Sequence, residues 1–323
     1  MRRRTLAWLL LLAMTLGLLG GCSAPSGAEQ GGGKLRIVCT IFPLYDWVRQ
    51  LLGARAADVE LTLLLDQGTD LHSYQPSADD IITISGCDLL VYVGGPSDQW
   101  VTDALRESQN REMVVLNLME LLGSAVREEE TVEGMEPEAG EEEAEYDEHV
   151  WLSLKNAAVV CGKLSETLGA LMPGSVDLER NTAAYLAELD ALDARYQAAA
   201  DAGAVKTLLF GDRFPFRYLV EDYGLDYYAA FAGCSAETEA SFETIVFLAD
   251  KVDELGLKTI LQTESSDGSI PNTIRQTTAA KDQQILTLDS MQSVTAADID
   301  AGATYLSVME QNLTVLSQAL SNQ

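Results

Sequence analysis

Histidine is nearly absent from this chain of 323 residues, which has only His72 and His149. Its five cysteines include no CxxC pair, so the sequence gives no support to a cysteine-based zinc site, and no disulfide pairing follows from their spacing. Basic residues are scarce too, with 21 Lys and Arg against 50 Asp and Glu, a formal net charge of −29. Such a surface repels phosphate backbones, which excludes nucleic acid as a partner.

No apolar run reaches the roughly 20 residues that cross a bilayer comfortably. The run at 6–19 follows three arginines and ends in the letters LGGC, which resemble a bacterial lipobox, where the chain is cut before an acylated cysteine. An ordinary signal peptide with an incidental cysteine is the alternative. Because flexible Ser- and Gly-rich residues follow, we expect a signal peptide at 1–21, a lipid on Cys22 and a tether at 22–33. The protein would then be lipid-anchored on the extracytoplasmic face of the cell membrane.

Short β-branched or aliphatic runs alternate with amphipathic stretches in two series. This alternation predicts an α/β fold with two doubly wound parallel-sheet lobes, at 34–172 and 204–323. The expected strands are 35–41, 59–65, 89–93, 114–118, 205–210, 227–230, 258–262 and 284–288. The expected helices are 44–52, 77–85, 98–108, 156–171, 216–223, 241–255, 271–279 and 297–320.

Between the two series, residues 173–203 are expected to form one long rigid helix that joins the lobes. Tyr185, Leu189, Leu192, Tyr196 and Ala199 are spaced by three or four residues, as on one face of a helix. At 1.5 Å per residue this helix would be roughly 40 Å long. That length favours a bridge between lobes over a helix inside one domain.

Residues 128–148 are mostly acidic and include glycine and proline. Like charges at this density are typical of a solvated loop without compact structure. The segment ends immediately before His149, so the predicted acidic loop adjoins one of the two histidines.

Five polar side chains could converge on one cleft. In doubly wound sheets, ligands bind at the carboxyl ends of the strands. His72 follows a predicted strand in a turn-rich loop, and Asp289, Asp212 and Glu264 also follow predicted strands. A single histidine in a loop is more often a surface residue than a ligand. Two of them beside strand-end carboxylates favour a site for zinc, manganese or iron.

Several segments resemble the substrate-binding lipoproteins of zinc and manganese ABC importers. Residues 65–74, LDQGTDLHSY, resemble the family's GxDPHxY segment, and residues 147–156, DEHVWLSLKN, resemble its DPHxWxxPxN segment. Residues 233–241, GCSAETEAS, resemble GxSxxxEPS. The resemblance extends from about residue 34 to the C-terminus. It implies two α/β lobes on one long helix that move little relative to each other, with the metal between them.

The same resemblance makes His72, His149 and Asp289 metal ligands. The family's third ligand, a His or Glu, falls on Arg213, which has no lone pair to give a metal. Asp212 or Glu264 could replace it, or water could complete the site. The zinc branch also has a flexible loop before its second ligand, and here that loop is Glu-rich without histidine.

The resemblance therefore implies a binding protein rather than an enzyme. It would capture a divalent transition metal and, as a monomer, deliver it to the membrane permease of an ABC importer. The loop favours Zn²⁺, with Mn²⁺ as the alternative. A zinc-dependent hydrolase could use the same ligands with a metal-bound water, but the sequence has no HExxH pattern. A surface adhesin, or a binding protein for another nutrient, is a further alternative.

Overall fold

The computed structural model describes residues 33–136, 146–235 and 239–323. The expected signal peptide, Cys22 and almost all of the tether lie outside these residues. From Leu35 to Gln323 the chain forms one compact unit. Within the described residues, no helix combines the length and the apolar character needed to cross a membrane.

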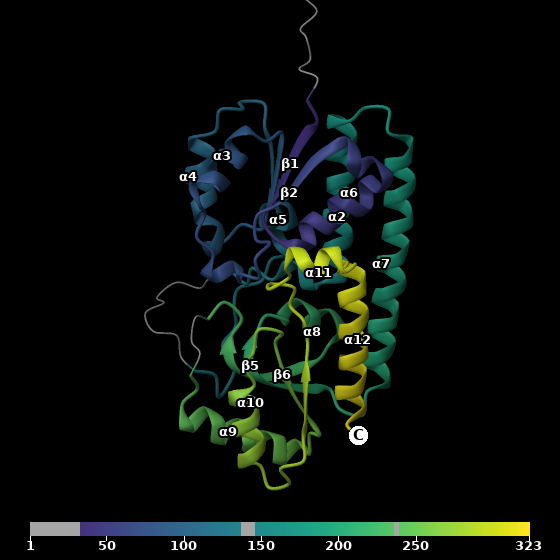
Figure 1. Ribbon diagram of the computed structural model, residues 1–323. Coiled ribbons are helices and arrows are strands. Elements are labelled where there is room, and N and C mark those ends of the chain that lie inside the picture. The colour runs from purple at the N-terminus through teal and green to yellow at the C-terminus, as the bar shows by residue number, and fades with distance from the viewer. Residues whose placement is uncertain (1–32, 137–145, 236–238) are drawn as a thin grey trace, which may run out of the picture. The chain divides into compact units, whose positions relative to one another are not determined.

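The first half of this unit is built on a four-stranded sheet with the strand order β2-β1-β3-β4, all parallel. Its strands are β1 (Leu35–Cys39), β2 (Val59–Leu63), β3 (Leu89–Tyr92) and β4 (Val114–Asn117). Helices flank the sheet on both sides (Figure 1). They are α2 (Phe42–Leu52), α3 (Ala78–Gly86), α4 (Gln99–Arg106), α5 (Leu118–Leu122) and α6 (Leu154–Leu171). Because helices cover both faces of the sheet, side chains on both faces of each strand are apolar, and the strand sequences are nearly continuous apolar runs.

The second half repeats this plan with the strand order β6-β5-β7-β8, again all parallel. Its strands are β5 (Thr207–Phe214), β6 (Asp226–Ala232), β7 (Thr259–Gln262) and β8 (Gln284–Thr287). Its first helices are α8 (Arg217–Tyr223), α9 (Phe242–Leu255) and α10 (Ser269–Thr277). The predicted class, two parallel-sheet α/β lobes, is confirmed.

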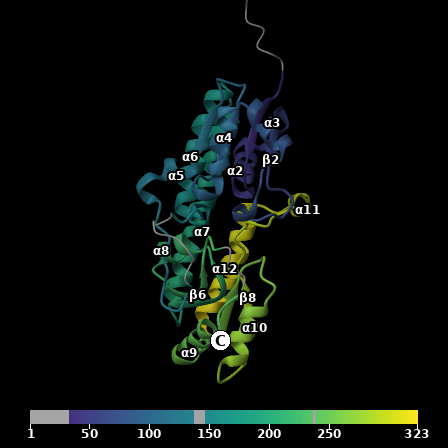
Figure 2. The same cartoon turned by 90° about the vertical axis from the view of Figure 1, so that its left-hand side faces the viewer.

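The long helix α7 (Val176–Ala202) lies between the two series and packs against elements of both. It contacts α6 and α2 of the first lobe and α12 (Tyr305–Ser321) of the second (Figures 1 and 2). The buried residues of α7 include Tyr185, Leu189, Leu192 and Tyr196 of the predicted face, while Ala199 is partly buried. The Tyr196 hydroxyl donates to the Met309 carbonyl of α12 at 2.6 Å. A continuous helix packed along both lobes opposes large changes in their relative position.

The prediction of a single helix at 297–320 is wrong. The structure has two helices there, α11 (Ala296–Asp300) and α12. Gly302 adopts a left-handed backbone conformation, with φ of 100°, which ends the first helix. Thr304 then begins the second one with a capping box to Ser307.

The acidic segment is also less solvated than its charge suggests. Met135 is buried, and the Glu136 N–H donates to the Ala230 carbonyl of β6 at 2.9 Å. Asp147 and Glu148 are buried as well. The prediction of a solvated loop is therefore wrong for Met135, Asp147 and Glu148. Glu128, Glu130, Glu133 and Tyr146 are exposed as expected, and 137–145 lie outside the described residues. Composition could not show this, because apolar and backbone contacts hold the segment.

Asp46 joins the two lobes from a fully buried position on α2. Its Oδ2 accepts the Tyr305 N–H at the start of α12, at 2.8 Å, and its Oδ1 accepts from Arg49 at 2.8 Å. The carboxylate therefore satisfies an amide at a helix N-terminus that has no partner inside the helix.

We expect Asp46→Ala to lower the free energy of unfolding by about 2–4 kcal/mol, because a buried amide and a guanidinium each lose a partner. Urea denaturation measures the change. Asp103→Ala removes an exposed carboxylate paired with Arg106, and this control should cost no more than about 0.5 kcal/mol. Equal losses in the two variants would contradict the role assigned to Asp46.

Candidate metal centre

His72 lies in a short 3₁₀ turn, Leu71–Ser73, in the loop after β2. The Asp70 carboxylate caps this turn by accepting the His72 backbone N–H at 2.9 Å. The Nδ1 atom of His72 lies 2.8 Å from the Ser97 hydroxyl and 3.4 Å from Oε2 of Glu148. These partners engage Nδ1 and leave Nε2 facing the interior of the site.

His149 is completely buried, and one carboxylate orients it. Oδ1 of Asp147 accepts the His149 backbone N–H at 2.8 Å and lies 2.9 Å from Nδ1 of the ring. Because an ionised carboxylate only accepts hydrogen bonds, Nδ1 carries a proton, and in the neutral ring Nε2 has the free lone pair. Metal-binding histidines are commonly held by such a carboxylate.

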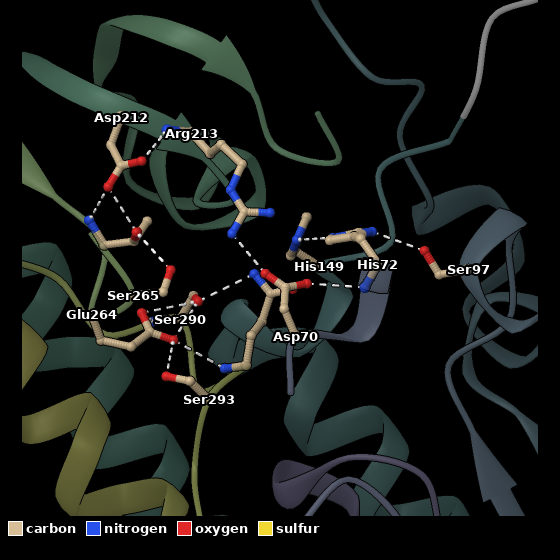
Figure 3. A network of polar contacts seen from close by, with 12 residues as sticks. Asp70, His72, Ser97, His149, Asp212, Arg213, Glu264, Ser265, Ser290 and Ser293 are labelled. Carbon is tan, nitrogen blue, oxygen red and sulfur yellow. Dashed lines mark hydrogen bonds and ion pairs between the residues drawn. The ribbon is translucent and has the colours of Figure 1, made fainter. Parts of the chain in front are cut away.

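The two rings meet through their Nε2 atoms, which are 3.1 Å apart (Figure 3). Two nitrogens bound to one tetrahedral zinc ion, each at about 2.0–2.1 Å, would lie about 3.3 Å apart. The observed spacing is close to that value. His72 and His149 are thus brought together from segments 77 residues apart, in the geometry of two ligands for one ion.

The electrostatic environment differs between the two rings. Burial lowers the pKa of His72 to about 3, and the neighbouring His149 and Arg213 act in the same direction. Burial alone would lower the pKa of His149, but the Asp147, Glu148 and Glu129 carboxylates outweigh it and raise that pKa. A proton taken up by the pair is therefore held by His149 rather than by His72.

Cys234 is the third group in the centre. Its sulfur and the available nitrogens of His72 and His149 all lie within 4.8 Å of one another. Among the described residues, this is the one group of three possible metal-ligating side chains at such spacing. Sequence reasoning missed Cys234, because it looked for cysteine pairs along the chain. The available signal was its position directly after Gly233, inside a segment that resembles the family.

The three predicted carboxylates are not part of this group. Oδ2 of Asp212 accepts the Thr263 N–H and hydroxyl, at 2.9 and 2.8 Å. Glu264 accepts from Ser290 and from two further residues of the loop after β8. Oδ1 of Asp289 accepts the Met291 N–H at 2.7 Å, and burial together with Glu264 raises the pKa of Asp289 to about 6. These carboxylates organise strand-end loops in the structure.

Arg213, at the expected third-ligand position, reaches across to the first lobe instead (Figure 3). Its Nη2 lies 2.6 Å from Oδ2 of Asp70, and both side chains are mostly buried. Burial alone would raise the pKa of Asp70, but the Arg213 charge and the His72 contacts lower it. The ion pair therefore links β5 to the turn that carries His72.

A cavity of about 410 Å³ opens beside the rings. Its lining combines polar and charged side chains, including Asp70, His72 and Arg213, with the apolar side chains of Phe231 and Ile270. A hydrated cation could approach the histidines through this cavity.

Histidine-selective ¹⁵N labelling tests the centre directly, since each of the two histidines gives its own signals. In metal-free protein we expect His72 to stay neutral down to about pH 4 and His149 to keep its charge above the usual pKa of about 6.5. Asp147→Asn should lower the pKa of His149, because it removes the nearest negative charge. Two rings that titrate together near pH 6.5 would contradict this geometry.

Comparison with known proteins gives consistent matches. The family model described as zinc-uptake complex component A, periplasmic, matches residues 37–319. The zinc-binding lipoprotein AdcA of Streptococcus pneumoniae is 32% identical over 321 residues, which is 98% of this chain and 61% of AdcA. The high-affinity zinc uptake protein ZnuA of Bacillus subtilis is 26% identical, covering 93% of this chain and 92% of ZnuA. The chain thus spans about three fifths of the length of AdcA.

Solved structures agree with this fold. The Zn(II)-bound ZnuA-like domain of S. pneumoniae AdcA has a TM-score of 0.70 at 29% identity, covering 90% of this chain and all of that domain. The periplasmic zinc-binding protein TroA of Treponema pallidum has a TM-score of 0.72 at 24% identity, covering 90% of this chain and all of TroA. At that identity the second match supports the fold alone.

Proposed function

We propose a function from one premise: the chain belongs to the family of the periplasmic component A of zinc-uptake complexes. It captures Zn²⁺ outside the cytoplasm and delivers it to the permease of a membrane ABC importer. One observation carries this proposal, the 3.1 Å between the Nε2 atoms of His72 and His149. Each ring has its Nδ1 engaged by other groups, so in its neutral form each ring offers its Nε2 lone pair to the same ion.

Zinc is preferred over manganese as the cargo. Imidazole nitrogen suits zinc, whereas manganese favours carboxylate, carbonyl and water oxygens. The zinc-binding relatives AdcA and ZnuA support the same choice. Asp289 stays a proposed ligand that closes the site on binding, with Asp212 and Glu264 as the weaker candidates.

The lobes are proposed to move little when the metal binds. Helix α7 packs against both lobes, and the Arg213–Asp70 ion pair joins them next to the site. The proposed protein is a monomer held at the membrane by a lipid on Cys22, and its role is binding rather than catalysis.

Calorimetric titration of chelator-stripped protein tests the binding function. The chain should bind Zn²⁺ more tightly than micromolar and Mn²⁺ more weakly. His72→Ala and His149→Ala should each weaken zinc binding by more than about 100-fold, since even residues that only orient a ligand contribute 10–100-fold. Zinc should also raise the thermal midpoint, because it binds the folded state.

Asp103→Ala, which removes only the exposed carboxylate paired with Arg106, is the control and should keep the affinity of the unaltered chain. If the unaltered chain binds neither metal below micromolar concentration, the proposed function is wrong. The same holds if the double histidine variant binds as well as the unaltered chain.

A further inference from the structure

We propose that Cys234 is the third protein ligand of the metal, and that its sulfur makes the site select zinc over manganese. This inference rests on the proposed function and deepens it, because it names the group that determines which metal is bound. It supplies a ligand for the coordination position that stays empty because Arg213 stands where the family has its third ligand.

The backbone around Cys234 directs its sulfur toward the two rings. The Cys234 N–H donates to Oε1 of Glu129 at 2.9 Å, and, against the larger opposing effect of burial, the Glu148 backbone lowers the pKa of the Cys234 thiol. Both partners come from the segment that leads into His149. The same segment therefore positions one imidazole and the sulfur.

Gly233 explains how the strand end comes so close to the site. A Cβ atom at this position would lie 2.8 Å from the Phe214 carbonyl oxygen and 3.1 Å from Cε1 of His149. A side chain there would push the ring away, so glycine lets β6 end against His149. The next residue along the chain is Cys234, whose sulfur lies within 4.8 Å of a ring nitrogen of each histidine.

Three nearby carboxylates that could compete for the third position have other partners. Asp70 is paired with Arg213, and backbone and hydroxyl donors occupy Asp212 and Glu264. Cys234 forms no disulfide. The other described cysteines, Cys39, Cys87 and Cys161, are fully buried in the core. Cys234 is the described cysteine that reaches the histidines.

The chemistry of sulfur gives the selectivity. Soft thiolate ligands favour zinc, whereas manganese prefers oxygen. Coordination forms a Zn–S bond of about 2.3 Å and breaks the S–H bond, and the proton passes to water. Two imidazoles and one thiolate leave a fourth position for water or a carboxylate.

X-ray absorption of the zinc-loaded full chain tests the ligand itself. The unaltered protein should show one sulfur in the first shell at about 2.3 Å, and Cys234→Ser should show none. With cobalt in place of zinc, the unaltered protein should give a near-ultraviolet sulfur-to-metal charge-transfer band that this variant lacks. Cys87→Ser is the matched control and should keep both signals, while Cys22 is present in every variant.

Affinity gives an independent measure. Cys234→Ser should weaken zinc binding by at least about 10-fold and change manganese binding less, so that the preference for zinc falls. Cys234→His offers a nitrogen in place of sulfur and should retain zinc binding without the charge-transfer band. This second variant separates loss of a ligand from loss of the fold.

The outcomes distinguish this inference from the function on which it rests. If zinc binding requires both histidines but shows no sulfur shell and is unchanged in Cys234→Ser, then Cys234 is not a ligand and the proposed function stands. If the unaltered chain binds no metal, both are wrong.

Discussion

The contact between the Asp147 carboxylate and Nδ1 of His149 is the interaction on which the centre depends. It fixes the tautomer and aims the opposite nitrogen at His72. The backbone of Asp147 is itself held from both lobes, because its N–H donates to the Arg127 carbonyl and its carbonyl accepts the Tyr218 hydroxyl of α8. The orientation of one imidazole is therefore a consequence of how the lobes pack.

Arg213 shows how a lost ligand position can keep a structural role. A cation beside a metal site opposes binding unless an anion neutralises it, and here Asp70 does so at 2.6 Å. The same carboxylate caps the turn that presents His72. The ion pair thus connects the second lobe to the turn that carries His72. Because Asp70 neutralises the Arg213 charge, that charge repels a bound cation less.

Much of the fold was predictable because alternating apolar strands and amphipathic helices are local patterns. The strand β5 exceeded its predicted end because it pairs with β6 past an irregularity between Phe210 and Arg213, a long-range contact that periodicity does not report. Both histidines were found from their loops. Glu264 and Asp289 follow strand ends as expected, whereas Asp212 lies inside β5, and sequence could not show that nearby amides and hydroxyls would occupy their oxygens.

Cys234 could not be recognised as a possible metal ligand from sequence, because its neighbours in the site come from distant segments. Its environment nevertheless limits the chemical states that its thiol can adopt. In the extracytoplasmic location proposed for this protein, an accessible thiol is open to oxidation unless it is bonded or protected. Cys39, Cys87 and Cys161 are protected by full burial, whereas Cys234 is only partly covered and lies beside two imidazoles. Burial and the carboxylates of Glu129 and Asp147 raise the pKa of its thiol, so a free thiolate is disfavoured there. A bound divalent cation reverses that balance and protects the sulfur at the same time.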